Sequence, residues 1–201
     1  MNRNRSAFGV AVIILNWNGL EDTRECLLSL QKIDYPRYTV IVVDNGSSGD
    51  DVECLKEQFG EYIDIVVNES NLGYAKGVNI GVKTAREKYA PDYYLLLNND
   101  TIVDAGFLSE LVESFESNGM AGIVGPKVYY YDAPQVLQSL GANINMYTGT
   151  ASYPGLKQKD VGQYDKISEV DWVGPCTLIK AEVFNKIGYF DEGYFAYWED
   201  V

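Results

Sequence analysis

The chain has 201 residues, of which 46% are hydrophobic and 22% charged, a composition typical of a folded globular domain and not of a disordered segment. Asp and Glu number 29 against 16 Lys and Arg, and the net charge of -13 repels phosphate backbones, which excludes nucleic acid as an expected partner. No apolar run reaches the roughly 20 residues that a membrane-spanning helix needs. We therefore expect a single domain over 1–201 that meets any membrane only at its surface.

The first half of the chain alternates buried strands with amphipathic helices. Continuous runs of aliphatic residues predict strands at 10–15, 40–43, 63–67 and 93–97, and apolar residues at helical spacing predict helices at 20–30, 52–59, 74–89 and 107–115. This alternation predicts an α/β fold with an open, mostly parallel sheet flanked by helices. In such sheets ligands bind at the carboxyl ends of the strands.

The alternation stops after Pro126. Residues 129–162 are rich in Tyr and Gly without a clear period, which predicts a loop-rich segment with short strands. A strand is predicted at 171–180 and a short helix at 181–187, ended by Gly188. The domain therefore divides into halves at about residue 125.

Polar residues follow three of the predicted strands. Asn16 and Asn18 follow the first, 44–48 the second, and 98–100 the fourth. Each group alone is explained by ordinary turn chemistry. Because the carboxyl ends of parallel strands share one edge, the three together indicate a nucleotide cleft. Asp100 is then a candidate ligand for a metal that bridges two phosphates, which needs only one or two protein carboxylates.

Cysteine and histidine usage narrows the chemistry further. The three cysteines fit no metal-ligand pattern and predict free thiols in a reducing compartment, with the cytoplasm the expected location. The chain has no histidine, so carboxylates are the candidates for both general base and metal ligand. Any metal is then expected to be hard, Mg²⁺ or Mn²⁺, and it would supply the positive charge that an acidic protein needs to bind an anionic nucleotide.

Five spaced motifs carry a family resemblance. In chain order they are Asn16-Trp17-Asn18-Gly19, Asp44-Asn45-Gly46-Ser47, Asn71-Leu72-Gly73-Tyr74-Ala75, Leu96-Leu97-Asn98-Asn99-Asp100 and Tyr197-Trp198-Glu199-Asp200. Together they resemble glycosyltransferase family 2, most closely the rhamnosyltransferase-like members of bacterial surface-polysaccharide assembly. The resemblance implies a nucleotide-diphospho-sugar transferase fold of the GT-A type, with a donor half at about 8–125 and an acceptor half at about 126–201. It also implies inverting transfer from a nucleotide-diphosphate sugar, with UDP or dTDP favoured, to a saccharide or lipid-linked acceptor.

The resemblance assigns roles on the donor side. The residues that correspond to the family's nucleotide contacts are Asn16, Asn18, Asp44, Asn71, Gly73, Ala75 and Asn99. Asp100 corresponds to the last residue of the family's Asp-any-Asp motif and is assigned to Mg²⁺ or Mn²⁺. The sequence departs from the family at Asn98, which replaces the first Asp of that motif, and at Lys76 and Val78, where further small residues are usual.

On the acceptor side Asp200 corresponds to the general base. Adjacent residues on a strand point to opposite faces, so only one of Glu199 and Asp200 is expected to reach the acceptor. Glu199 would either hold the local backbone or contact the acceptor. Trp172 offers an aromatic face to a sugar, although such residues also serve as plain core. Relatives continue past this point, so the chain is expected to be a truncated catalytic core, with any peripheral membrane contact in the part that follows.

Other functions are weighed against this one. A sugar-nucleotide pyrophosphorylase would carry a Gly-rich, Arg-bearing loop after the first strand, and a dinucleotide dehydrogenase would carry Gly-any-Gly-any-any-Gly there. The residues at 16–19 match neither pattern. A non-catalytic module that binds a nucleotide sugar or a polysaccharide stays open, because Asn98 leaves the metal motif with a single carboxylate.

Overall fold

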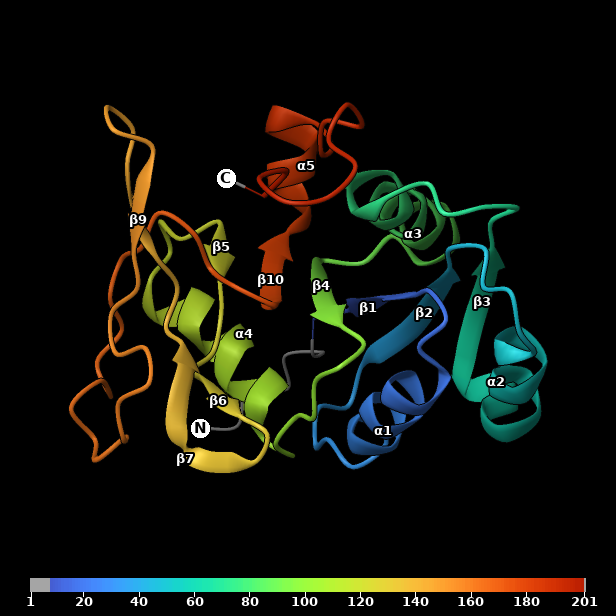
Figure 1. The fold of residues 1–201 in the computed structure, drawn as a ribbon, viewed down its shortest axis with the longest axis horizontal. Helices are drawn as coiled ribbons and strands as arrows, with labels where there is room; N and C mark the ends of the chain where they lie inside the picture. Colours follow the sequence, from blue (N-terminus) through green and yellow to red (C-terminus); the bar gives the residue numbers. More distant parts are fainter. Residues whose placement is uncertain (1–7, 201) are drawn as a thin grey trace, which may run out of the picture.

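The computed structural model describes residues 8–200, and its centre is a six-stranded sheet in the order β3-β2-β1-β4-β10-β5 (Figure 1). The strands are β1 (Val10–Asn16), β2 (Tyr38–Asp44), β3 (Ile63–Val67), β4 (Tyr93–Asn98), β5 (Ile123–Val124) and β10 (Cys176–Lys180). Strands β1 to β4 are parallel, whereas β10 runs antiparallel to both β4 and β5. The predicted open, mostly parallel α/β sheet is confirmed.

Helices cover both faces of the sheet (Figure 1). They are α1 (Leu20–Leu30), α2 (Asp51–Phe59) with the short 3-10 turn Gly60–Tyr62 after it, α3 (Tyr74–Tyr89), α4 (Phe107–Ser117) and α5 (Ala181–Ile187). Helices α1, α2 and α4 pack with Val12 and Ile14 of β1 on one face, and α3 and α5 pack with Ala11 and Ile13 on the other. Both faces of β1 are therefore buried, which is why its sequence is continuously apolar.

Two glycines let α3 lie close to β1. A Cβ on Gly77 would lie 2.5 Å from Leu15 Cδ1, and a Cβ on Gly81 would lie 2.5 Å from Ile13 Cγ2. The two glycines are four residues apart and so share one face of the helix. A larger side chain at either position would force the facing side chain of Leu15 or Ile13, or the helix itself, to move.

Most predicted boundaries agree with the structure, but the strand expected at 171–180 begins only at Cys176, so that boundary was wrong. Gly174 has a φ of 96°, which ends an extended backbone, and Pro175 has no N–H to give to a strand neighbour. Trp172 instead pairs with Ala142 in an isolated antiparallel bridge. The segment before β10 thus pairs with the residue before β8 and does not extend the strand in the central sheet.

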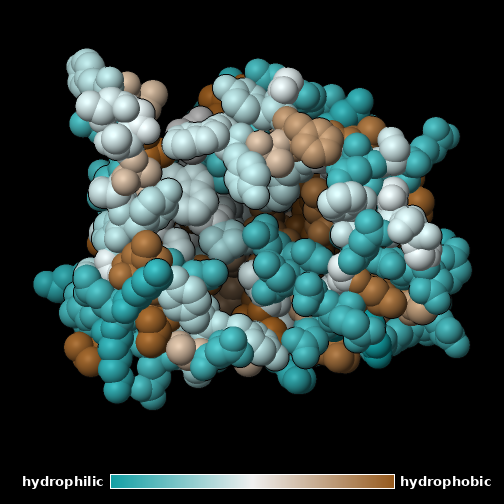
Figure 2. Space-filling view, in the orientation of Figure 1, coloured by the Kyte–Doolittle hydropathy of each residue, from teal (hydrophilic) through white to brown (hydrophobic). Residues whose placement is uncertain are grey.

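The region between β5 and β10 is loop-rich with short strands, as expected. Its strands are β6 (Val128–Tyr130), β7 (Ala133–Ser139), β8 (Asn143–Asn145) and β9 (Thr150–Ser152), paired as β6–β7 and β8–β9. The β8–β9 hairpin stands clear of the body of the molecule, and the centre of the same face is recessed (Figures 1 and 2). Within 8–200, no helix is long and apolar enough to cross a membrane.

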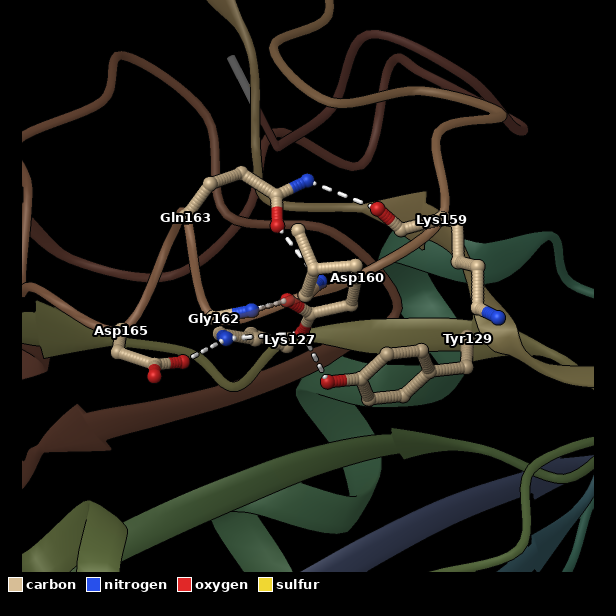
Figure 3. A network of polar contacts seen from close by, with 8 residues as sticks. Lys127, Tyr129, Lys159, Asp160, Gly162, Gln163 and Asp165 are labelled. Carbon is tan, nitrogen blue, oxygen red and sulfur yellow. Dashed lines mark hydrogen bonds and ion pairs between the residues drawn. The ribbon is translucent and has the colours of Figure 1, made fainter.

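A polar network anchors the long loop after β9 to β6 (Figure 3). Asp160 accepts hydrogen bonds from the Tyr129 hydroxyl at 2.6 Å, from Lys127 Nζ at 2.9 Å and from the Gly162 backbone N–H at 2.9 Å. Lys127 also pairs with Asp165 at 2.5 Å. The hydrogen bonds from Tyr129 and Lys127 lower the pKa of Asp160 to about 2, so this carboxylate stays charged and keeps the loop in place.

Candidate functional site

The three polar clusters lie together at the carboxyl edge of the parallel strands. Asn16 at the end of β1 is paired in register with Asp44 at the end of β2. On the other side of β1, Leu15 is paired with Asn98 at the end of β4. The convergence predicted from the strand order therefore holds.

Asn16 is the centre of a buried hydrogen-bond network. Its side chain is fully buried, and its Nδ2 donates to Asp44 at 2.8 Å and to Asp51 at 2.9 Å. Its Oδ1 accepts from the Thr23 hydroxyl at 2.7 Å. Asn16 thus holds the carboxylates at both ends of the loop between β2 and α2 and a residue near the start of α1, and its predicted contact with a nucleotide base stays a prediction.

Asp44 is also turned into the protein. Only 1% of its surface is exposed, and its carboxylate accepts hydrogen bonds from the Ser47 N–H at 3.0 Å and the Ser47 hydroxyl at 2.6 Å, besides the one from Asn16. Its predicted base contact stays a prediction as well, because a base that binds Asp44 directly would have to replace one of these donors.

Asn18 lies at the surface beside these buried groups. It has a φ of 52°, and its Oδ1 accepts from the Ser48 backbone N–H at 2.8 Å and the Ser48 hydroxyl at 3.1 Å. Both residues line an open depression of about 440 Å³ between the starts of α1 and α2. The loops after β1 and β2 are therefore locked together, with a solvent-accessible hollow next to them.

Asn45 is a site residue that the sequence analysis missed. Its Nδ2 donates to Asn71 Oδ1 at 3.0 Å and to the Gly73 carbonyl at 3.1 Å, and its Oδ1 accepts from the Leu72 N–H at 3.2 Å. A buried Asn directly after β2 thus fixes the loop before α3. The available signal was its place directly after a buried strand, next to Asp44, but these contacts are not local in sequence.

The loop at 71–75 has a tight conformation at Gly73. This residue has φ 84° and ψ 172°, a region that is essentially restricted to glycine. A Cβ there would lie 2.4 Å from the Phe195 carbonyl oxygen, and the Tyr74 N–H donates to that same oxygen at 2.7 Å. Ala75 is fully buried. The backbone of this loop therefore contacts the segment around Phe195 directly.

The end of β4 presents one free carboxylate. Asn99 donates to the Thr23 hydroxyl at 3.0 Å, which ties it to the Asn16 network. Asp100 is exposed, and no other residue in the described range makes a hydrogen bond or ion pair with its side chain. Across the same range no cluster of three potential metal ligands exists. A single free carboxylate fits a metal whose remaining ligands are phosphate oxygens and water, and does not fit a metal held by protein alone.

The last described residues bring two more carboxylates to this region. Trp172 Nε1 donates to Asp200 Oδ2 at 2.5 Å. Glu199 Oε2 is buried with no partner in the described part of the chain, and burial, followed by the nearby charge of Asp200, raises the pKa of Glu199. The pKa of Tyr74 is raised by burial and then by the charges of Asp200 and Glu199, so both carboxylates lie near the start of α3.

The expectation that Glu199 and Asp200 diverge because they share a strand was wrong in its reason. The backbone around 194–200 consists of turns and bends, and Tyr197 and Trp198 have φ values of 68° and 69°. The two side chains nevertheless point differently, since Glu199 Oε2 is buried while Asp200 bonds to Trp172.

Comparison with known proteins identifies the family. The sequence profile described as glycosyl transferase family 2 matches residues 11–188. The chain belongs to glycosyltransferase family 2. This match covers four of the five spaced motifs and leaves only the last one, which ends at Asp200, outside the matched residues.

Curated relatives are about a quarter identical to the chain over the aligned residues. A low-salt glycan biosynthesis hexosyltransferase of Haloferax volcanii is 25% identical over 96% of this chain and 59% of its own length. The rhamnosyltransferase WbbL of Escherichia coli is 27% identical over 94% of this chain and 73% of its own length. An N-acetylglucosaminyl-diphospho-decaprenol L-rhamnosyltransferase of Mycobacterium tuberculosis is 24% identical over 81% of this chain and 58% of its own.

Solved structures of glycosyltransferases have the same fold. A mannosyltransferase of Pyrobaculum calidifontis, in complex with GDP-Man and Mn²⁺, superposes with a TM-score of 0.63 at 19% identity over 94% of this chain and 49% of that one. TarS 1–349 of Staphylococcus aureus in complex with UDP also gives 0.63, at 18% identity over 96% and 52%. The GT-A fold is thus confirmed, and the chain spans about half of these structures and 59% of the Haloferax relative.

Proposed function

We propose that this chain carries out inverting transfer of a sugar from a nucleotide-diphosphate donor to a hydroxyl of a saccharide or lipid-linked acceptor. One observation carries the proposal. The Tyr74 N–H bonds to the Phe195 carbonyl, which brings the segment that ends in Asp200 to the loop assigned to the donor. This contact supports placing the carboxylate for the acceptor and the polar edge for the donor in one site.

On the donor side, the loops after β1, β2 and β4 would hold the nucleotide and its diphosphate. Among the assigned contacts, Asn18 and Asn99 lie on the loops after β1 and β4, and Asn71 and Gly73 lie on the loop before α3. The buried Asn16 and Asp44 support the loops after β1 and β4 through Ser47 and Thr23. Mg²⁺ or Mn²⁺ at Asp100 would supply the positive charge that a departing diphosphate requires. The Mn²⁺ bound with GDP-Man in the Pyrobaculum complex supports this choice of metal.

On the acceptor side, Asp200 would accept the proton of the attacking hydroxyl. The acceptor oxygen bonds to the anomeric carbon while the bond from that carbon to the diphosphate oxygen breaks, and the bonding electrons leave on the diphosphate. A single displacement of this kind inverts the anomeric configuration. Glu199 has a buried Oε2 with no partner among the described residues, so this oxygen is less accessible to an acceptor hydroxyl, and the side chain is placed to shape the local backbone.

Relatives support the substrate classes. UDP, UDP-GlcNAc and GDP-Man are the nucleotides in complexes of the structural relatives, and the mycobacterial rhamnosyltransferase is named for a diphospho-decaprenol substrate. We propose a UDP- or dTDP-sugar as donor, and work in the cytoplasm at the inner face of the cell membrane, where a lipid-linked acceptor would be reached.

A binding module without catalysis is the second candidate. It is favoured by Asn98, which leaves Asp100 as the single carboxylate at the end of β4. The two functions differ in whether a nucleotide sugar that binds is also turned over.

The test compares the wild type with Asp200→Asn. With a set of nucleotide sugars and Mn²⁺, we expect the variant to keep its donor affinity within about twofold by calorimetry while transfer falls by roughly 10²–10⁴-fold, the usual scale for loss of a general base. Asp191→Asn is the matched control, because it removes a charge from the same segment but keeps the Oδ1 that accepts from Gly193.

Two outcomes would contradict the proposal. Transfer by Asp200→Asn at the wild-type rate would remove Asp200 as the base. A wild type that binds donors tightly but turns over none of them, with any saccharide or lipid-linked acceptor, would support the binding module instead.

A further inference from the structure

We infer that Trp172 is a positioning residue that orients the carboxylate of Asp200 for proton transfer, an inference that rests on the proposed function. The indole Nε1–H donates to Asp200 Oδ2 at 2.5 Å, across 28 residues of sequence. In the described structure no residue donates to Asp200 Oδ1. The indole thus occupies one oxygen and leaves the other for the acceptor hydroxyl.

The chemistry of indole suits this role. Its N–H is a donor only, so it cannot take the proton in place of the carboxylate. A carboxylate is a weak base, and its usefulness depends on how well it is held against the hydroxyl. A donor that fixes one oxygen therefore contributes to the rate through geometry.

Trp172 is itself held in place by residues next to β8 and β9. Its backbone N–H donates to the Ala142 carbonyl at 3.1 Å and its carbonyl accepts from the Ala142 N–H at 2.9 Å. Its ring meets the Tyr153 ring edge-on, with 6.5 Å between centroids. The indole is thus anchored by the residues around β8 and β9, which do not belong to the segment that carries Asp200.

The segment that carries Asp200 has an anchor that does not involve Trp172. It is bound to the loop before α3 by the hydrogen bond from the Tyr74 N–H to the Phe195 carbonyl. The hydrogen bond from Trp172 therefore links the region around β8 and β9 to the carboxylate, while Phe195 links the same segment to the loop before α3. Together these contacts hold the carboxylate between the region around β8 and β9 and the loop before α3.

The first test uses Trp172→Phe, which keeps an aromatic ring and removes the N–H. We expect kcat for transfer to fall about 10- to 100-fold, with the donor KM unchanged within about twofold, since misplacing a catalytic group affects the chemical step. Tyr164→Phe is the matched control: it also removes one side-chain donor from the acceptor half, here the one to Gln158, and it should transfer normally.

A double-mutant cycle separates positioning from an independent role. If Trp172 acts through Asp200, Trp172→Phe in the Asp200→Asn background should change the remaining rate by less than about threefold. Losses that multiply in the double variant, together with a raised acceptor KM, would overturn the inference and make Trp172 a platform for the acceptor sugar.

A spectroscopic test reads the hydrogen bond without any turnover. The chain has three tryptophans, so ¹⁵N labelling gives three indole N–H signals, which single Trp→Phe variants assign. Asp200→Asn should shift the Trp172 signal and leave that of Trp17 unchanged. An unmoved Trp172 signal would refute the inference, even in an active enzyme. Absence of any sugar transfer by the wild type would refute the proposed function instead, with the hydrogen bond still decided by this measurement.

Discussion

Asn16 shows how a residue predicted to bind a ligand can act one step away from it. Its amide bonds to Asp44, Asp51 and Thr23, and each of these groups is itself buried. A buried polar group left without a partner costs about 1–3 kcal/mol, so one Asn at this point stabilises three neighbours together. The structure thus supports a framework role for Asn16, whereas Asn18 is exposed to solvent.

Asp100 differs from these residues because its carboxylate has no hydrogen-bond or ion-pair partner among residues 8–200. We expect Asp100→Ala to abolish the gain in nucleoside diphosphate affinity that Mn²⁺ or Mg²⁺ gives the wild type, a gain of about tenfold or more, because the metal would lose its protein ligand. Calorimetry of UDP binding with and without the metal measures it.

The control for that experiment is Asp132→Ala, which removes an exposed carboxylate between β6 and β7. It should keep the full metal dependence. An Asp100→Ala protein with the same metal dependence as the wild type would remove the assignment of the metal to this residue.

At the scale of elements, the start of α3 is fixed by contacts with segments far away in the sequence. Helix α3 is placed on β1 by Gly77 and Gly81, and the loop before it receives the last segment of the chain at Gly73. Asn45 fixes the same loop from β2 through Asn71 and Gly73. The start of α3 is therefore the joint between the donor loops and the segment that carries Asp200.

Gly73→Ala tests this joint. Its φ of 84° and ψ of 172° strain any residue with a Cβ, and the added atom would lie 2.4 Å from the Phe195 oxygen. We expect the free energy of unfolding to fall by about 1–3 kcal/mol in urea denaturation, with faster proteolysis near Phe195.

Gly119→Ala provides the comparison, because nothing lies within 4 Å of a Cβ at that position. It should be neutral or slightly stabilising, since alanine restricts the unfolded chain more than glycine does. Equal stability of the two variants would mean that the contact at Gly73 adjusts without cost.

At the scale of the whole molecule, the stability of a chain with a net charge of -13 depends on how its carboxylates are paired. The clearest paired carboxylate is Asp160, which joins the loop after β9 to β6 through Tyr129 and Lys127 (Figure 3). Its folded pKa of about 2 lies below the ordinary value of 3.8. The stabilisation is therefore present above about pH 4 and is lost as the pH falls through about 2.

Asp160→Asn should accordingly lower the melting temperature at pH 7, and the difference from the wild type should shrink as the pH falls from about 4 towards 2. Thermal denaturation followed by circular dichroism across this range measures the difference. Asp165→Asn should have a smaller effect, because the side chain of Asp165 is 70% exposed. A difference that stays constant down to about pH 2 would show that the charge of Asp160 is not what holds the loop.

The sequence by itself determined the strands and helices of the first half and the edge where its polar residues meet. Strands buried on both faces require continuous apolar runs, and parallel strands necessarily bring their carboxyl ends together. Asn16, Asp44 and Asn98 could be grouped on those grounds alone. Only the tertiary structure decided that β10 lies antiparallel between β4 and β5, that Asn45 holds the loop before α3, and that Trp172 bonds to Asp200. These contacts join segments that are far apart in the chain and lie in irregular loops. Local periodicity of the sequence does not predict which distant residues such a loop will contact.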